Sequence, residues 1–177
     1  MTDTADPTWE QAEDAPVYLG NFYDDFAPGT VYRHRLGRTI SETDNTWFTL
    51  LTTNTNPLHF DRVYARTAEL DDVLVNSTFT LSVVTGLSVG DISENVVANL
   101  GWDNVKLRTP VRIGDTLRAE TLILSKRESR SRPHTGIVRF ATRGLNQHGE
   151  VVISFERTIL VYKRGFGPRF SGSSRPG

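Results

Sequence analysis

The sequence predicts an α+β fold in which an antiparallel sheet wraps around a long central helix. Helical patterns occupy the first half of the chain, and alternating segments separated by turn residues follow from residue 98 onward. The length of 177 residues suits a single domain that can bury a hydrophobic core. These observations favour one compact sheet-and-helix unit over several domains.

The first elements expected are a strand and a helix. Alternating side chains over residues 29–39 indicate a strand. A helix then begins after one of two capping residues, Ser41 or Thr43, with acidic residues in its first turn. It must end by Asn56, because Pro57 disfavours the helical conformation in the residue before it.

Residues 75–90 fit two structures. Phe79, Leu81 and Val83 alternate with Thr and Ser, as in a strand. The length of the segment and its lack of charge suit a buried helix instead, and we favour the helix. Before this segment, Asp61 is placed to cap a short helix.

Strands and turns account for the second half of the chain. In the segment 136–145, Val138 and Phe140 are expected to face one side of the sheet, and Arg139 and Arg143 the other. The expected strands cover residues 102–107, 116–126, 136–145 and 151–162, with turns at 110–115 and 146–149.

Composition limits the classes of function. The net charge of −1 and the pI near 6.4 give no electrostatic reason to expect nucleic acid or an anionic membrane as a partner. The absence of Cys excludes disulfides, thiolate nucleophiles and Cys-ligated zinc. Apart from His59, the chain has His34, His134 and His148, which are isolated and have no metal-ligand spacing, so neither a metal nor a redox cofactor is expected.

The two ends of the chain differ from its body. Residues 1–16 are polar and acidic, lack the features of a secretory signal and are expected to be mobile. Residues 165–177, rich in Gly, Ser, Pro and Arg, are expected to form a flexible tail. A single domain over residues 17–164 and a cytoplasmic location follow as expectations.

The stretch most indicative of function is TTNTNPLHFD, residues 52–61. Its residue types also suit an ordinary turn, in which a proline ends one helix and Asp61 caps the next. The alternative is a catalytic turn. In that reading Pro57 fixes a rigid scaffold, the His59 imidazole exchanges protons near neutral pH, and the Asn54 side chain orients a water molecule.

A family resemblance favours the catalytic alternative. Residues 48–61, FTLLTTNTNPLHFD, resemble the motif of the MaoC-like dehydratases and R-specific enoyl-CoA hydratases, which are hotdog-fold enzymes. Residues 74–87, LVNSTFTLSVVTGL, resemble the central helix of that family, and residues 108–120, RTPVRIGDTLRAE, resemble its hairpin. The resemblance covers residues 20–163 and is closest to the hydratases of mesaconyl-CoA and itaconyl-CoA.

The resemblance implies a set of site residues. His59 matches the catalytic His, whereas Asn54 stands where the family has an Asp, and Thr53 where it commonly has Gly. Either His59 is the acid/base while Asn54 positions water, which we favour, or the site only binds acyl-CoA. Backbone donors at the start of the central helix would polarise the thioester carbonyl. These donors belong to Asn76, Ser77 and Thr78.

The implied reaction is reversible hydration of a short unsaturated acyl-CoA, with coenzyme A present only as part of the substrate. A thioesterase and a non-catalytic acyl-CoA-binding module are the alternatives. Family members pair two hotdog units, so a homodimer or a higher homo-oligomer is expected. Lys126, Arg130 and Arg132 belong to a basic tract that is either a solvated face or a contact for the phosphates of CoA or a substrate carboxylate.

Overall fold

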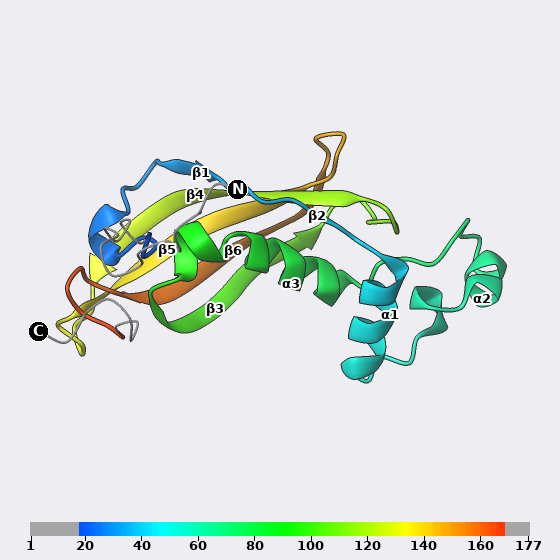
Figure 1. The fold of residues 1–177 in the computed structure, drawn as a ribbon, viewed down its shortest axis with the longest axis horizontal. Coiled ribbons are helices and arrows are strands. Elements are labelled where there is room, and N and C mark those ends of the chain that lie inside the picture. Colours follow the sequence, from blue (N-terminus) through cyan, green and yellow to red (C-terminus); the bar gives the residue numbers. More distant parts are fainter. Residues whose placement is uncertain (1–17, 169–177) are drawn as a thin grey trace, which may run out of the picture.

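The computed structural model describes residues 18–168, which form an antiparallel sheet with one helix lying across a face of it (Figure 1). Hydrogen bonding sets the strand order β1-β4-β5-β6-β3, and β2 also pairs with β4. The expected α+β class is confirmed. The strands are β1 (Val31–Arg33), β2 (Arg38–Thr39), β3 (Val96–Leu107), β4 (Thr116–Glu128), β5 (Thr135–Leu145) and β6 (Val151–Tyr162). The α-helices are α1 (Glu42–Leu51), α2 (Arg62–Thr67) and α3 (Ser77–Leu87).

Helix α3 is the central helix, and it confirms the choice of helix over strand for this segment. Asn76 caps it, because its side-chain oxygen accepts a hydrogen bond from the Thr78 N–H at 2.9 Å. Val84 is fully buried against the sheet. A Cβ at Gly144 of β5 would lie 2.6 Å from a Val84 methyl group, so glycine permits this close approach of helix and strand.

Two strands differ from the expectation. The strand expected over residues 29–39 is divided into β1 and β2, because the pairing with β4 is interrupted over residues 34–37. The buried ring of His34 bonds Asp91 at 2.7 Å and Thr121 at 2.9 Å. Strand β3 begins at Val96 rather than at residue 102, since pairing with β6 outweighs the low strand propensity of the Asn and Gly in this segment.

Helix α1 and the loop after it follow the expectation closely. Ser41 caps α1, and Asp44 completes a reciprocal pair of backbone contacts at 3.1 Å each. The helix ends at Leu51, before Pro57. Thr53 has a φ of 57°, which is a left-handed conformation that is unfavourable for a β-branched residue.

The sheet has two distinct ends, which we name by a nearby element. At the α1 end, β3 and β5 finish and β4 and β6 begin, close to α1 and the loop that carries His59 (Figure 1). At the Arg164 end, β4 and β6 finish and β5 begins. Within the described residues, no helix is long and apolar enough to cross a bilayer.

The expected terminal segments fall largely outside the described residues. Residues 1–16 lie outside them entirely, as do residues 169–177 of the expected tail. In the described part of that tail, the Phe166 ring stacks on the His134 ring with centroids 3.9 Å apart. This contact attaches the chain after β6 to the loop between β4 and β5.

Candidate active site

His59 lies in a short 3₁₀ helix, Pro57–His59, between α1 and α2. The Asn56 side-chain oxygen caps this turn by accepting from the Leu58 N–H at 3.1 Å. Nδ1 of the half-buried His59 ring lies 3.0 Å from the carbonyl oxygen of Leu74. Because a carbonyl oxygen only accepts hydrogen bonds, Nδ1 carries a proton. In the neutral ring, Nε2 then holds a free lone pair, as a general base requires.

His59 lines a cleft of about 340 Å³ at the α1 end of the sheet. The cleft joins the His59 loop to the start of α3 and to the segment between β3 and β4. Its surface is mainly apolar with several hydroxyl groups, and no carboxylate from residues 18–168 lines it. The other lining residues are Leu74, Val75, Ser77, Thr80, Leu107, Arg108, Thr109, Pro110, Val111 and Val152.

Asn45 of α1 connects the parts of this site, although the sequence analysis did not single it out. Its side chain is fully buried, at 0% exposure. Its Nδ2 donates to the carbonyl oxygens of His59 at 2.8 Å and of Leu74 at 3.1 Å, and its Oδ1 accepts from the Asn76 N–H at 2.8 Å. One carboxamide thus fixes the His59 loop, the carbonyl that holds the imidazole, and the start of α3. The signal in the sequence is an amide three residues before Phe48, on the inward face of a helix.

The Asn54 side chain is directed into its own loop. Its Oδ1 accepts from the Asn56 N–H at 3.0 Å, and its backbone N–H donates to Thr49 at 3.0 Å. Across residues 18–168, no hydrogen bond joins Asn54 to His59, and Asn54 does not line the cleft. The oxygen expected to hold water is therefore engaged within the loop, and Nδ2 is the Asn54 atom left to donate to water.

The start of α3 offers fewer donors than expected. The Asn76 N–H donates to Asn45, and the Thr78 N–H donates to the Asn76 side chain. In the described part of the chain, the Ser77 N–H has no acceptor, and Ser77 is the member of this trio that lines the cleft. The structure thus narrows the expected set of oxyanion donors to Ser77, at the positive end of the helix dipole.

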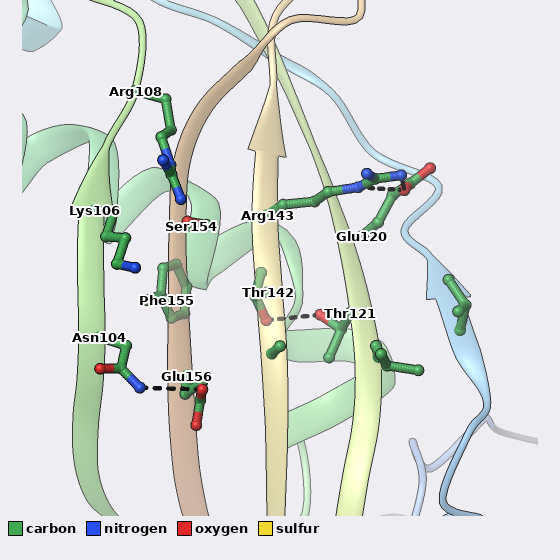
Figure 2. A pocket seen from close by; sticks show the side chains of 13 residues that line it. Asn104, Lys106, Arg108, Glu120, Thr121, Thr142, Arg143, Ser154, Phe155 and Glu156 are labelled. Carbon is green, nitrogen blue, oxygen red and sulfur yellow. Dashed lines mark hydrogen bonds and ion pairs between the residues drawn. The ribbon is translucent and has the colours of Figure 1, made fainter.

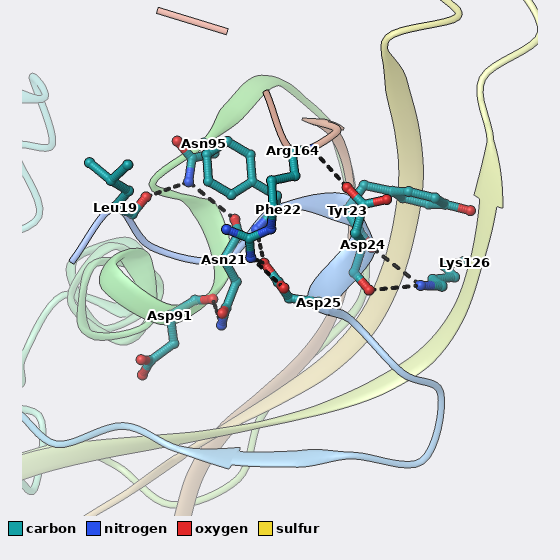
Figure 3. A network of polar contacts seen from close by, with 10 residues as sticks. All are labelled: Leu19, Asn21, Phe22, Tyr23, Asp24, Asp25, Asp91, Asn95, Lys126 and Arg164. Carbon is teal, nitrogen blue, oxygen red and sulfur yellow. Dashed lines mark hydrogen bonds and ion pairs between the residues drawn. The ribbon is translucent and has the colours of Figure 1, made fainter. Parts of the chain in front are cut away.

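The expected basic contacts lie far from His59 within one chain. Lys126 is near the end of β4, and Arg130 and Arg132 follow in the next loop, at the Arg164 end of the sheet. Lys126 Nζ donates to the carbonyl oxygens of Tyr23 at 3.3 Å and Asp24 at 3.4 Å (Figure 3). The structure does not bring these residues together with the cleft, since β4 separates them along its length.

Known proteins share both the sequence pattern and the fold of this chain. The model of the MaoC-like domain matches residues 25–143. The chain belongs to the MaoC-like family. A mesaconyl-CoA hydratase of Cereibacter sphaeroides is 37% identical over 145 residues, which cover 82% of this chain and 42% of that protein. This chain spans between 41% and 49% of the length of the first four curated MaoC-like relatives.

Solved structures agree with the assignment to the MaoC-like family. A MaoC domain protein dehydratase of Chloroflexus aurantiacus superposes with a TM-score of 0.80 at 31% identity, covering 92% of this chain and 47% of that one. A Mycobacterium tuberculosis protein with a double hotdog fold gives a TM-score of 0.74 at 21% identity, covering 89% of this chain and 47% of that one. The fold is therefore a hotdog.

Proposed function

We propose that this protein catalyses reversible addition of water to a short unsaturated acyl-CoA thioester. The observation that carries the proposal is the His59 imidazole, which Leu74 fixes with Nε2 available, on the wall of a cleft that no described carboxylate lines. The MaoC-like family and the name of the Cereibacter sphaeroides relative support this reaction class.

The proposed mechanism uses His59 as both base and acid. Nε2 takes a proton from water as the water oxygen bonds to Cβ, and the double-bond electrons move to form a thioester enolate. The Ser77 N–H donates to the enolate oxygen. The imidazolium then returns its proton to Cα, so one water is added and the enzyme is restored.

The replacement of the family's Asp by Asn54 is compatible with this mechanism. One positioned acid/base contributes about 10²–10⁴-fold in rate, and one oxyanion donor about 2.7–4 kcal/mol. In this proposal Asn54 has only a minor part in positioning water, since its Oδ1 is bonded to Asn56 and it does not line the cleft. Asn54→Asp keeps that oxygen contact but removes the Nδ2 donor, so kcat should change less than tenfold, whereas a larger fall would contradict the minor role given to Asn54.

For the substrate, we propose a branched C5 dicarboxylyl-CoA such as mesaconyl-CoA or itaconyl-CoA. The support is the name of the relative that shares 37% identity with this chain. Crotonyl-, mesaconyl- and itaconyl-CoA offered in parallel separate the candidate functions. Loss of the conjugated-thioester absorbance without release of thiol indicates a hydratase, and release of thiol indicates a thioesterase. Binding without either change indicates a non-catalytic module.

We also propose that the chain works as a homodimer, with higher homo-oligomers built from it. Strand β3 is an open edge of the described sheet, and the relatives that the chain half covers are about twice as long. An unpaired edge with apolar side chains favours pairing with another strand. Sedimentation at several concentrations should give the mass of a dimer, and a stable monomer would contradict the proposal. Exposed apolar residues on this edge are Leu100, Trp102, Val105 and Leu107.

A further inference from the structure

A second hollow, of about 590 Å³, lies on the face of the sheet opposite α3 (Figure 2). Strand pairing places Glu120, Arg143, Ser154 and Lys106 in one row across β4, β5, β6 and β3. Ala141 of β5 also lines this hollow, and small side chains such as Ala and Ser leave the space open. The hollow is therefore a feature of the sheet surface, distinct from the His59 cleft.

The acidic groups of this hollow are already paired. The Glu120 carboxylate accepts from Arg143 Nη2 at 2.7 Å. The Glu156 carboxylate accepts from the guanidinium of Arg139 and from Asn104 Nδ2. Neither carboxylate is left to balance a further cation.

Two cations of the same hollow are unpaired. Within residues 18–168, Lys106 and Arg108 form no ion pair, and both are exposed. Figure 2 shows both side chains extending from β3 toward β6, with the Arg108 guanidinium near Ser154. An ammonium, a guanidinium and a hydroxyl are the groups that bind phosphate in proteins.

Arg108 also connects this hollow with the His59 cleft. It lines both spaces, and its backbone N–H donates to the Val152 carbonyl at 2.8 Å, which fixes the end of β3 against β6. An extended molecule can therefore have one end beside His59 and its other end on the opposite face. A lysine on an edge strand also discourages aggregation, but that role does not account for Arg108 on the rim shared by the two spaces.

We propose that Lys106, Arg108 and Ser154 form a subsite for the phosphate groups of the coenzyme A part of the substrate. This inference rests on the proposed acyl-CoA hydration. The acyl-thioester end lies in the His59 cleft, and the phosphates at the other end of the substrate lie on the two unpaired cations. The subsite replaces the basic tract at the Arg164 end as the CoA contact within one chain.

The test compares thioesters with and without phosphates. Lys106→Gln and Arg108→Gln should each raise KM for crotonyl-CoA about tenfold, because a charge-assisted contact is lost. KM for crotonyl-pantetheine, which lacks the phosphates, should stay within twofold. Arg35→Gln is the matched control, since Arg35 is exposed, forms no ion pair with another described residue and lies outside both spaces.

Other results would overturn the subsite. Equal KM increases with both thioesters would indicate general structural damage. No increase with crotonyl-CoA would show that neither cation contacts the phosphates. An increase confined to mesaconyl-CoA would assign the cations to the acyl carboxylate. If the parent hydrates neither thioester, the proposed function fails. The phosphate subsite is then tested by calorimetric titration of the parent and the variants with coenzyme A. About tenfold weaker binding by the variants would support the subsite, whereas equal binding, or no binding by the parent, would contradict it.

Discussion

The segment that carries Asp25 and the loop that carries His59 lie at opposite ends of the sheet and are held by different chemistry. At the Arg164 end, the Arg164 guanidinium donates to the Asp25 carboxylate at 2.6 Å, and its backbone N–H donates to Asp24 at 2.7 Å (Figure 3). At the α1 end, the neutral side chains of Asn45 and Asn56 hold the loop that carries His59. The first set of contacts is partly exposed and charged, whereas Asn45 is buried and uncharged.

This difference has a consequence for the chemistry at the α1 end. The loop is held without ion pairs to its imidazole, so His59 has no carboxylate partner among the described residues. In the proposed mechanism, the charge that develops on the substrate is stabilised by the neutral Ser77 N–H at the start of α3. The Arg164 end is held by partly exposed ion pairs, and in the proposed mechanism the α1 end provides a fixed base.

The largest expected effect is the loss of the base. His59→Ala should lower kcat for the best thioester of the panel by about 10²–10⁴-fold, because proton transfer from water is lost. The fold should persist, since the side chain is only half-buried. His148→Ala is the matched control, because His148 is exposed in the turn between β5 and β6. Equal activity of His59→Ala and the parent would refute the mechanism.

Removal of the Asn45 network should give the next effect. Asn45→Leu leaves two buried carbonyl oxygens and one N–H without this partner, and should lower the free energy of unfolding by about 2–3 kcal/mol. Arg164→Ala at the other end should cost about 0.2–1 kcal/mol. Urea unfolding measures both, and equal costs would remove the contrast between the two ends.

Activity separates positioning by Asn45 from stability alone. Asn45→Asp keeps the contact to the Asn76 N–H but loses both Nδ2 donations, including that to the Leu74 carbonyl. It should reduce kcat more than KM at a temperature where the variant is fully folded. An unchanged kcat would show that Asn45 does not position His59.

At the Arg164 end, Asp25 should contribute to the pH dependence of stability. Burial raises the pKa of Asp25, but the Phe22 N–H and the Arg164 guanidinium outweigh it and hold the pKa below its ordinary value. The resulting stabilisation is present above the unfolded-state pKa of about 3.9 and is lost as the pH falls through the lower folded-state pKa. Asp25→Asn should therefore lose less stability than the parent on acidification below about pH 4. Parallel pH profiles of the two would contradict this assignment.

The smallest expected effect is a gain in stability. Thr53 has a φ of 57°, and glycine adopts this conformation without a Cβ clash. Thr53→Gly should raise the free energy of unfolding by roughly 0.5–1 kcal/mol, because relieved strain exceeds the entropy cost of glycine. Thr55→Gly, two residues later in the same loop, is the matched control and should not stabilise. Destabilisation by Thr53→Gly would indicate that the Thr side chain itself supports the loop.

Sequence patterns predicted those parts of the fold that local chemistry determines. The cap at Ser41, the stop before Pro57 and the buried segment around Val84 are confirmed, because capping and apolar composition act over short distances. The division of the first strand was missed, since it depends on His34 contacting Asp91, which is distant in the sequence.

The candidate site shows the same limit. His59 was identified from its motif, but the partner of its ring is a backbone carbonyl, and any residue at position 74 would supply one. Asn45 was missed because its partners are three backbone groups from two segments that are distant in the sequence, the His59 loop and the residues before α3. The roles given to Lys126 and its neighbours followed from charge alone, which does not say at which end of a strand a residue lies.

The most direct test of the central claim is the tautomer of His59. ¹⁵N NMR of the ring, at a pH where it is neutral, should show a proton on Nδ1 and a bare Nε2, as the 3.0 Å contact with the Leu74 carbonyl requires. A proton on Nε2, or exchange between both nitrogens as in free histidine, would contradict the account of His59 as a preset base.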